Sequence, residues 1–284
     1  MILVTGATAP VGRSVVEQLL ATGHGVRALT RNPETATLPA EVEIAAGDLS
    51  APETLPPALD GISAVFVQAY VPGFAPAFLK AAKDAGVRRI VFQSSGAVLD
   101  DVREQPNMIA AFHAEIERAI EESGLEWTFL RLEVVAANAL QWAMDVPGQV
   151  KAGDIVRGPY GEAAGSPLHE ADLAAVGVAA LTRDGHAGAK YRLTGPESLT
   201  HKEQVSMIGE AIGRPLRYEE LPRDVARQEM LDRRQPPPVV DMLLDAWARA
   251  VGQPALVLPT VEEVTGKPAR TFREWAADHA AEFR

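Results

Sequence analysis

The stretch MILVTGATAPVGRSVVEQLL, residues 1–20, decides the fold. Its apolar run, residues 2–4, ends at the turn TGATAPVG, and apolar residues then recur at helical spacing over residues 11–20. The stretch therefore predicts a buried strand, a tight turn and an amphipathic helix. At such a turn the free N–H groups and the dipole of the helix can hold a phosphate. Gly6 would let the backbone approach a ligand closely, and Gly12 would let the helix pack close to the strand.

The turn carries two of the glycines of a dinucleotide-binding fingerprint, and its middle position is Ala9. Alanine fits there only with a negative φ, and its methyl group would crowd a pyrophosphate slightly. Because the turn lies between a strand and a helix, we predict a nucleotide site; a purely structural turn is the alternative. The residues expected around the diphosphate are Gly6, Thr8, Ala9, Pro10, Val11 and Gly12.

The composition limits the class of protein. With 284 residues, 47% of them hydrophobic, the chain can form one domain, or one domain with a lobe. The absence of cysteine excludes disulfides, thiolate metal sites and cysteine nucleophiles, and no metal site is predicted. No apolar stretch is long enough to span a bilayer, so we expect a cytoplasmic protein without a membrane partner. A net charge of −11 argues against nucleic acid as a partner.

Apolar strands alternate with helical segments along the chain. After the first strand, strands are expected at residues 26–30, 42–45, 62–68, 89–93, 125–132 and 191–193. Helices are expected at residues 75–86, 108–122, 138–145, 169–182, 200–213, 222–233, 238–251 and 270–283. This alternation predicts an α/β fold, a Rossmann-like doubly wound parallel sheet with a small, mostly helical C-terminal lobe. Residues 236–238, three prolines, would form either the hinge of a lid or a rigid turn.

Ligands bind at the carboxyl ends of the strands in such a sheet. Arg31 ends the second strand, where arginine can pair with the 2′-phosphate of NADP; a solvated loop arginine is the alternative. Asp48, followed by Leu49, ends the third strand. Its carboxylate can accept a hydrogen bond from the adenine amino group, or it can cap the next helix, as Ser50 also could.

The fourth strand ends at Ala69 and Tyr70, and the fifth strand ends at Ser94 and Ser95. A small hydroxyl group at the carboxyl end of a middle strand lies beside the nicotinamide in such sheets, so Ser94 is predicted to contact the cofactor. Ala69, at the end of the fourth strand, is also predicted to contact it. Tyr70 and Ser95 are predicted to contact the substrate. A turn formed by the Ser-Ser-Gly sequence is the competing interpretation.

Several motifs together resemble the NmrA-like branch of the atypical short-chain dehydrogenase/reductases. They are TGAT at 5–8, RNP at 31–33, GDL at 47–49, SSG at 94–96, TFLR at 128–131, EADLA at 170–174 and LTGPE at 193–197. The resemblance implies a Rossmann core over residues 1–135 that binds NADP(H). It also implies a substrate-cleft lobe over residues 136–284, interleaved with the last strand and helices of the sheet. Members include NADPH-dependent quinone reductases and inactive redox sensors that regulate partner proteins.

The chain departs from the family at the catalytic pair. Catalytic short-chain dehydrogenases carry Tyr-x-x-x-Lys on the helix after the fifth strand, but no tyrosine occurs here between Tyr70 and Tyr160. His113 falls at the lysine position. It would bond the cofactor ribose or act as the acid, with Glu117 setting its tautomer; a surface histidine is the alternative.

The remaining candidates for the substrate pocket follow the sixth strand. Tyr160 and His169 would supply the missing proton. Asn138 resembles the family asparagine that lines the cleft, and Trp142, one turn further along, would stack on an aromatic substrate. The structural alternatives are a helix cap for Asn138 and core packing for Trp142.

The sequence predicts an NADPH-dependent oxidoreductase acting on a small planar quinone, enone or other carbonyl compound, as a monomer or homodimer. Quinone reduction needs less acid catalysis than ketone reduction because its product is aromatic, so a quinone tolerates the missing tyrosine. One alternative is a non-catalytic NADP(H) sensor with a protein partner. Another is an isomerase or epimerase that retains its cofactor.

Overall fold

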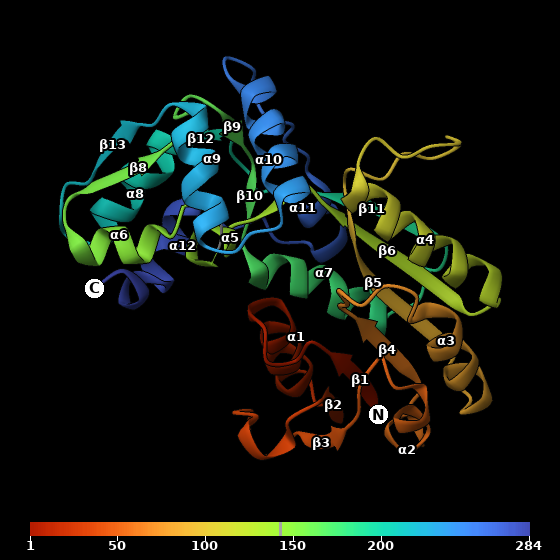
Figure 1. Cartoon of the computed structure of the whole chain (residues 1–284). Coiled ribbons are helices and arrows are strands. Elements are labelled where there is room, and N and C mark those ends of the chain that lie inside the picture. The colour runs from red at the N-terminus through yellow and green to blue at the C-terminus, as the bar shows by residue number, and fades with distance from the viewer. Residues whose placement is uncertain (142–143) are drawn as a thin grey trace. The chain divides into compact units, whose positions relative to one another are not determined.

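The computed structural model describes residues 1–141 and 144–284, which form two compact units (Figure 1). The first unit consists of Met1–Leu132, Glu170–Leu193 and Thr260–Lys267. The second unit consists of Glu133–His169, Thr194–Pro259 and Pro268–Arg284. Within the described residues, none of the helices has the length and apolar character needed to cross a bilayer.

The first unit is built on a seven-stranded sheet in which every neighbouring pair is parallel. In spatial order its strands are β11 (Ala189–Leu193), β6 (Glu126–Leu132), β5 (Arg89–Ser95), β4 (Ala64–Val67), β1 (Ile2–Thr5), β2 (Val26–Thr30) and β3 (Glu43–Ala46). The order reverses between β1 and β4, which is the topological switch point of a doubly wound sheet. The predicted fold class is therefore confirmed.

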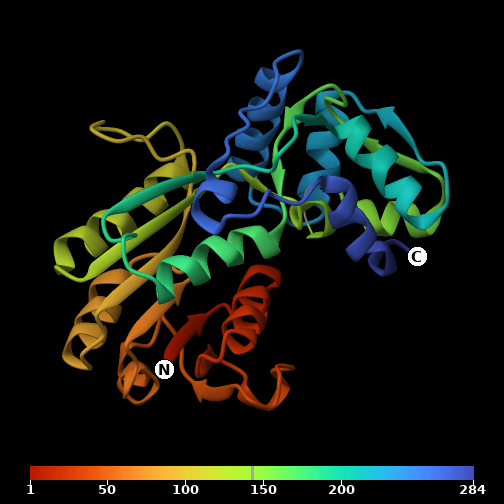
Figure 2. The same cartoon turned by 180° about the vertical axis from the view of Figure 1, so that it is seen from behind.

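Helices cover both faces of this sheet (Figures 1 and 2). On one face, α7 packs against α1 and β4, and Gly177 of α7 lies against the Phe66 ring. The neighbouring residues Val65 and Val67 point to the opposite face, where they pack in a hydrophobic core with residues of α2, α3 and α4. The helices of the first unit are α1 (Pro10–Ala21), α2 (Leu55–Leu59), α3 (Ala75–Asp84), α4 (Met108–Ser123), α7 (Glu170–Thr182) and α11 (Thr260–Thr265), with short 3₁₀ turns η1 (Pro33–Thr35) and η2 (Pro52–Thr54). Because β1 and β4 are buried along their whole length, only their ends are open to a ligand.

The second unit is mostly helical, as predicted, with short strand pairs that the sequence pattern did not predict. Its helices are α5 (Asn138–Gln141), α6 (Val146–Ala152), α8 (His201–Ile212), α9 (Arg223–Asp232), α10 (Pro237–Ala250), α12 (Phe272–Asp278) and the 3₁₀ helix η3 (Ala280–Phe283). Its strand pairs are β7 (Val134–Val135) with β10 (Pro167–Leu168), β8 (Ile155–Gly158) with β13 (Arg217–Glu220), and β9 (Ala164–Gly165) with β12 (Leu199–Thr200). One core gathers around the fully buried Trp275, and a second joins α9 to α10.

Two segments of the second unit can be compared with the structure predicted for them. Of the helix expected over 138–145, the structure describes α5 up to Gln141, and residues 142 and 143 lie outside the described residues. A separate helix, α6, starts after Asp145, whose carboxylate accepts a hydrogen bond from the Gly148 N–H. A side-chain cap of this kind starts a new helix, which explains why α6 begins at Val146. The prolines at 236–238 form the cap and first turn of α10, where a missing N–H costs nothing. This position favours the rigid turn over the hinge.

The contact between the opening turn and α1 is testable. A Cβ atom on Gly12 would lie 2.2 Å from the Gly6 carbonyl oxygen. We expect Gly12→Ala to lower the free energy of unfolding by about 1–3 kcal/mol, because backbone must move to admit the methyl group. Gly153→Ala is the matched control, since apart from its chain neighbours no described residue has an atom within 4 Å of its Cβ position. Equal stability of the two variants in urea unfolding would contradict the close contact.

Candidate functional site

The opening turn has the geometry that a diphosphate requires. Gly6 has a φ of +65°, and a Cβ atom there would lie 2.8 Å from Gln68 Oε1, so only glycine fits. Ala9 has a φ of −81°, which meets the condition set for an alanine at this position, and its N–H donates to the Gly6 carbonyl at 2.9 Å. Pro10 is the first helical residue, and Ala9 has no side chain to cap α1. The next N–H groups of the first turn therefore have no partner within the helix and can bind an anion.

The start of this turn is anchored to the neighbouring strand. The Thr5 hydroxyl donates to the Gln68 carbonyl at 2.8 Å and accepts from the Gln68 N–H at 2.8 Å, which ties together the ends of β1 and β4. After the turn, Thr8 is exposed, whereas Val11 and Gly12 are buried against the sheet. The arrangement fits a diphosphate over Gly6 and the start of α1.

Arg31 and Asp48 lie near each other at the ends of β2 and β3. Hydrogen bonds from the Ser50 N–H (2.8 Å) and hydroxyl (2.7 Å) to Asp48 Oδ1 lower the pKa of Asp48, and the Arg31 charge adds to them. Arg31 is exposed and Leu49 is buried. Neither Asp48 nor Ser50 caps η2, since its cap position is Ala51. Instead, the carboxylate closes a local turn by accepting both hydrogen bonds from Ser50.

The residues that end β4 and β5 differ in exposure. Ala69 is buried, and the Tyr70 side chain is 72% exposed. The Ser94 hydroxyl is buried and donates to Glu117 Oε1 at 2.5 Å. The Ser95 hydroxyl is half-buried and accepts from the Ala97 N–H at 3.2 Å, as in a serine-stabilised turn.

A buried charge network starts at Ser94. The Arg131 guanidinium donates to both oxygens of Glu117 (3.0 and 2.6 Å) and to both oxygens of Asp100 (2.9 and 2.8 Å). Lys190 also donates to Asp100 at 2.8 Å. The hydrogen bonds from Arg131 and then Lys190 hold the pKa of Asp100 well below its usual range. The network joins α4, β5, β6 and β11 beside the loop that follows β5.

Sequence reasoning did not predict this network, although a signal was present. Arg131 is a charged residue between the apolar Leu130 and Leu132 of β6, and Glu117 is one turn from Ile120 on the buried stripe of α4. A buried charge needs a partner of opposite sign, so these two residues could have been paired from the pattern.

His113 is half-buried on α4, between the rings of Phe92 and Phe112. Burial lowers its pKa, so the imidazole is neutral at pH 7. Its Nδ1 lies 2.8 Å from the Ile109 carbonyl, to which the neutral ring donates its N–H. The Ile109 carbonyl, and not Glu117, therefore fixes the tautomer, and Nε2 is left as an acceptor.

The remaining predicted residues belong to the second unit. The Tyr160 hydroxyl accepts a hydrogen bond from Arg223 at 3.2 Å, and Tyr160 has a φ of +52°. His169 is buried, with Nε2 3.3 Å from Asp278 Oδ2. Asn138 is exposed at the start of α5, and Trp142 lies outside the described residues.

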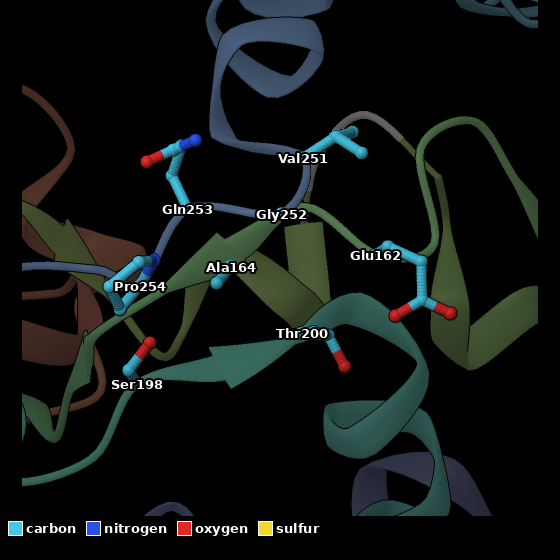
Figure 3. A pocket seen from close by; sticks show the side chains of 8 residues that line it. All are labelled: Glu162, Ala164, Ser198, Thr200, Val251, Gly252, Gln253 and Pro254. Carbon is cyan, nitrogen blue, oxygen red and sulfur yellow. The ribbon is translucent and has the colours of Figure 1, made fainter.

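The second unit also has an open pocket of about 420 Å³ (Figure 3). It is lined by Glu162, Ala164, Ser198, Thr200, Val251, Gly252, Gln253 and Pro254. Its polar side chains point in different directions in Figure 3, whereas a catalytic pocket has polar groups that converge. The lining includes none of the predicted site residues that the structure describes.

Comparisons with known proteins agree with a dinucleotide site. Residues 6–184 match the model of a family described as NAD(P)H-binding. Over its full length the chain is 42% identical to a (4-alkanoyl-5-oxo-2,5-dihydrofuran-3-yl)methyl phosphate reductase of Streptomyces griseus, of which it covers 99%. It is 38% identical, again over its full length and 99% of the relative, to an NAD(P)H azoreductase of Xenophilus azovorans.

A solved structure extends the similarity to the fold. The NADPH-dependent quinone oxidoreductase of Escherichia coli superposes with a TM-score of 0.78 at 26% identity, covering 98% of this chain and 99% of that one. The structure of that protein complexed with NADPH superposes with a TM-score of 0.76 at 25% identity, again over 98% and 99% of the two chains.

The charge network generates a stability prediction. Glu117→Leu leaves the buried Arg131 guanidinium with only Asp100, so we expect a loss of about 3 kcal/mol in the free energy of unfolding. The double variant Glu117→Leu/Arg131→Met removes both buried charges and should lose less than the sum of the single variants, by about 1–3 kcal/mol. Urea unfolding of the four proteins measures this coupling. Strictly additive losses would mean that the pair does not act as a unit.

Proposed function

Because this chain belongs to the NAD(P)H-binding family and is an NAD(P)H-dependent reductase like its relatives, we propose that it uses NADPH to reduce a small, flat, conjugated acceptor. The family membership agrees with the predicted resemblance to the NmrA-like branch. The opening turn carries the proposal, since Gly6 and Gly12 allow a close turn at the switch point of the sheet, and the first N–H groups of α1 have no side-chain cap. The relatives are named for a furanone, an azo and a quinone acceptor, all of them conjugated, which supports a quinone or enone here.

The preference for NADPH is inferred from the end of β2. Arg31 can pair with a 2′-phosphate, whereas a preference for NAD is typical of an acidic residue there. The NADPH complex of the Escherichia coli relative supports this choice. Besides the turn residues, we propose that Asp48, Leu49, Ala69 and Ser94 contact the cofactor.

The chain's own residues must provide binding and a proton, while the bound nicotinamide supplies a hydride. The lowered pKa keeps the His113 ring neutral at pH 7, so His113 is a poor proton donor. Its Nδ1–H is bound to the Ile109 carbonyl, and Nε2 is suited to accept a hydrogen bond from a ribose hydroxyl. Tyr160 and His169 are the proposed sources of the proton. The Tyr160 hydroxyl accepts from Arg223 and so keeps its own O–H to donate.

Substrate contacts are proposed for Tyr70, Ser95, Asn138 and Trp142. The exposed ring of Tyr70 follows β4, where a planar acceptor could stack on it. The proposed reaction proceeds without a Tyr-x-x-x-Lys pair on α4, which favours an acceptor whose reduced form is aromatic and needs little acid catalysis.

Turnover tests the proposal directly. NADPH oxidation followed at 340 nm with a panel of benzoquinones, naphthoquinones, enones and aromatic azo compounds should show steady turnover with at least one class. If NADPH raises the melting temperature but no compound is reduced, the catalytic role is wrong and the redox-sensor alternative gains support. Product formation without net NADPH consumption would instead indicate an isomerase.

The cofactor preference has its own test. We expect Arg31→Ala to raise the KM for NADPH roughly tenfold to a hundredfold, because one charge-assisted hydrogen bond to phosphate is lost, and to change the KM for NADH by less than about twofold. Arg118→Ala, which removes an exposed arginine from α4, is the control for the change in net charge. Equal losses for both coenzymes would contradict the role of Arg31 in phosphate recognition.

A further inference from the structure

Two glutamines occupy neighbouring positions at the switch point of the sheet. Gln68 directly follows β4, and Gln93 lies on β5. The register pairs Val67 with Phe92, so Gln68 and Gln93 are the next pair along these parallel strands. Side chains alternate along a strand, so Gln68 points to the same face of the sheet as Phe66, the face covered by α7. The two carboxamides therefore lie side by side on one face.

Each of these side chains has a buried oxygen, Oε1, with no hydrogen-bond partner among the described residues. Gln68 as a whole is only 8% exposed, and its Nε2 donates to the Tyr70 hydroxyl at 3.4 Å. Turning the Gln68 carboxamide by 180° would exchange oxygen and nitrogen and still leave a buried polar atom unsatisfied. Buried polar groups are almost always paired, so an orphaned pair at a binding edge indicates a partner that is supplied from outside the chain.

The position of the pair indicates which part of a dinucleotide would supply that partner. The Gln68 carboxamide lies against the diphosphate turn, since a Cβ atom on Gly6 would be 2.8 Å from its Oε1. Arg31 and Asp48 mark the adenosine end at β2 and β3, on one side of β1. If the diphosphate lies over Gly6, the nicotinamide half must lie on the other side of β1, at the carboxyl ends of β4 and β5. That half carries hydrogen-bond donors in its carboxamide N–H₂ and its ribose hydroxyls.

We infer that Gln68 and Gln93 hydrogen-bond the nicotinamide half of NADPH and position it for transfer. The inference rests on the proposed function, because it requires that NADPH is the cofactor. It assigns the two glutamines as positioning residues, and it explains why their buried amide oxygens have no partner among the described residues.

Methionine substitutions separate this role from a structural one. Gln68→Met and Gln93→Met keep the length of the side chain and remove its unsatisfied amide, so the melting temperature without ligand should not fall. The Kd for NADPH, measured by titration calorimetry, should rise about tenfold. Gln18→Met is the matched control, because Gln18 Nε2 donates to the Ala171 carbonyl at 2.8 Å. It should lower the melting temperature and leave the Kd for NADPH unchanged.

Two further ligands identify the donor. 2′,5′-ADP lacks the nicotinamide half, so its Kd should be equal in wild type and the glutamine variants. The 3-acetylpyridine analogue of NADPH keeps the ribose hydroxyls and lacks the amide N–H₂. If the carboxamide is the donor, the variants bind this analogue as well as wild type does; if the ribose is the donor, they lose affinity for it as they do for NADPH.

The failure of this inference differs from the failure of the proposed function. If wild type does not bind NADPH, the proposed cofactor is wrong and the inference falls with it. If wild type binds NADPH and the glutamine variants bind it equally well, an internal water satisfies the pair and the inference is overturned. An equal loss of affinity for 2′,5′-ADP would overturn it too, since the effect would then arise at the adenosine end or from altered folding.

Discussion

The contact between Gly12 and the Gly6 carbonyl is the constraint on which the nucleotide site depends. No side chain fits between these two residues, so the first turn of α1 packs closely on the turn that follows β1. The first N–H groups of α1 are therefore held next to the carboxyl end of β1, where an anion can bind. The Thr5 hydroxyl ties the end of β4 to the end of β1 at the same edge. The ends of the remaining central strands are then arranged along this edge by the parallel order of the sheet.

Much of this arrangement is predictable from sequence, because alternation of apolar strands and helices dictates which residues stand at the carboxyl edge. Arg31 and Asp48 follow from that rule, and the structure places them near each other. The partners within the edge are not predictable in the same way. Asp48 bonds Ser50 and His113 bonds the Ile109 carbonyl because of local backbone geometry, which no pattern of residue types specifies. The glutamine pair depends on strand register, which becomes known only when β4 and β5 are aligned.

The charge network shows how the same edge is made rigid. The Ser94 hydroxyl donates a hydrogen bond to Glu117. The Arg131 guanidinium donates both to Glu117 and to Asp100, which lies in the loop after β5. A hydroxyl held in this way is less available to a ligand than one that faces solvent. The missing tyrosine and the engaged serine have the same effect, because both reduce the number of proton-donating groups at this edge. The proposed reduction of a quinone or enone allows for this, since it needs little acid catalysis.

The first unit is assembled from three separate parts of the chain, and this has a consequence for how the protein is made. The edge strand β11 (Ala189–Leu193) and the helix α11 (Thr260–Thr265) belong to the first unit but are synthesised long after β1 to β6. Pairing across such sequence distances is slow, and until it occurs β6 is an unprotected edge. Until β11 pairs with β6, the exposed edge of β6 can pair with a strand of another copy of the chain. We therefore expect correct folding to depend on the speed of translation or on a chaperone.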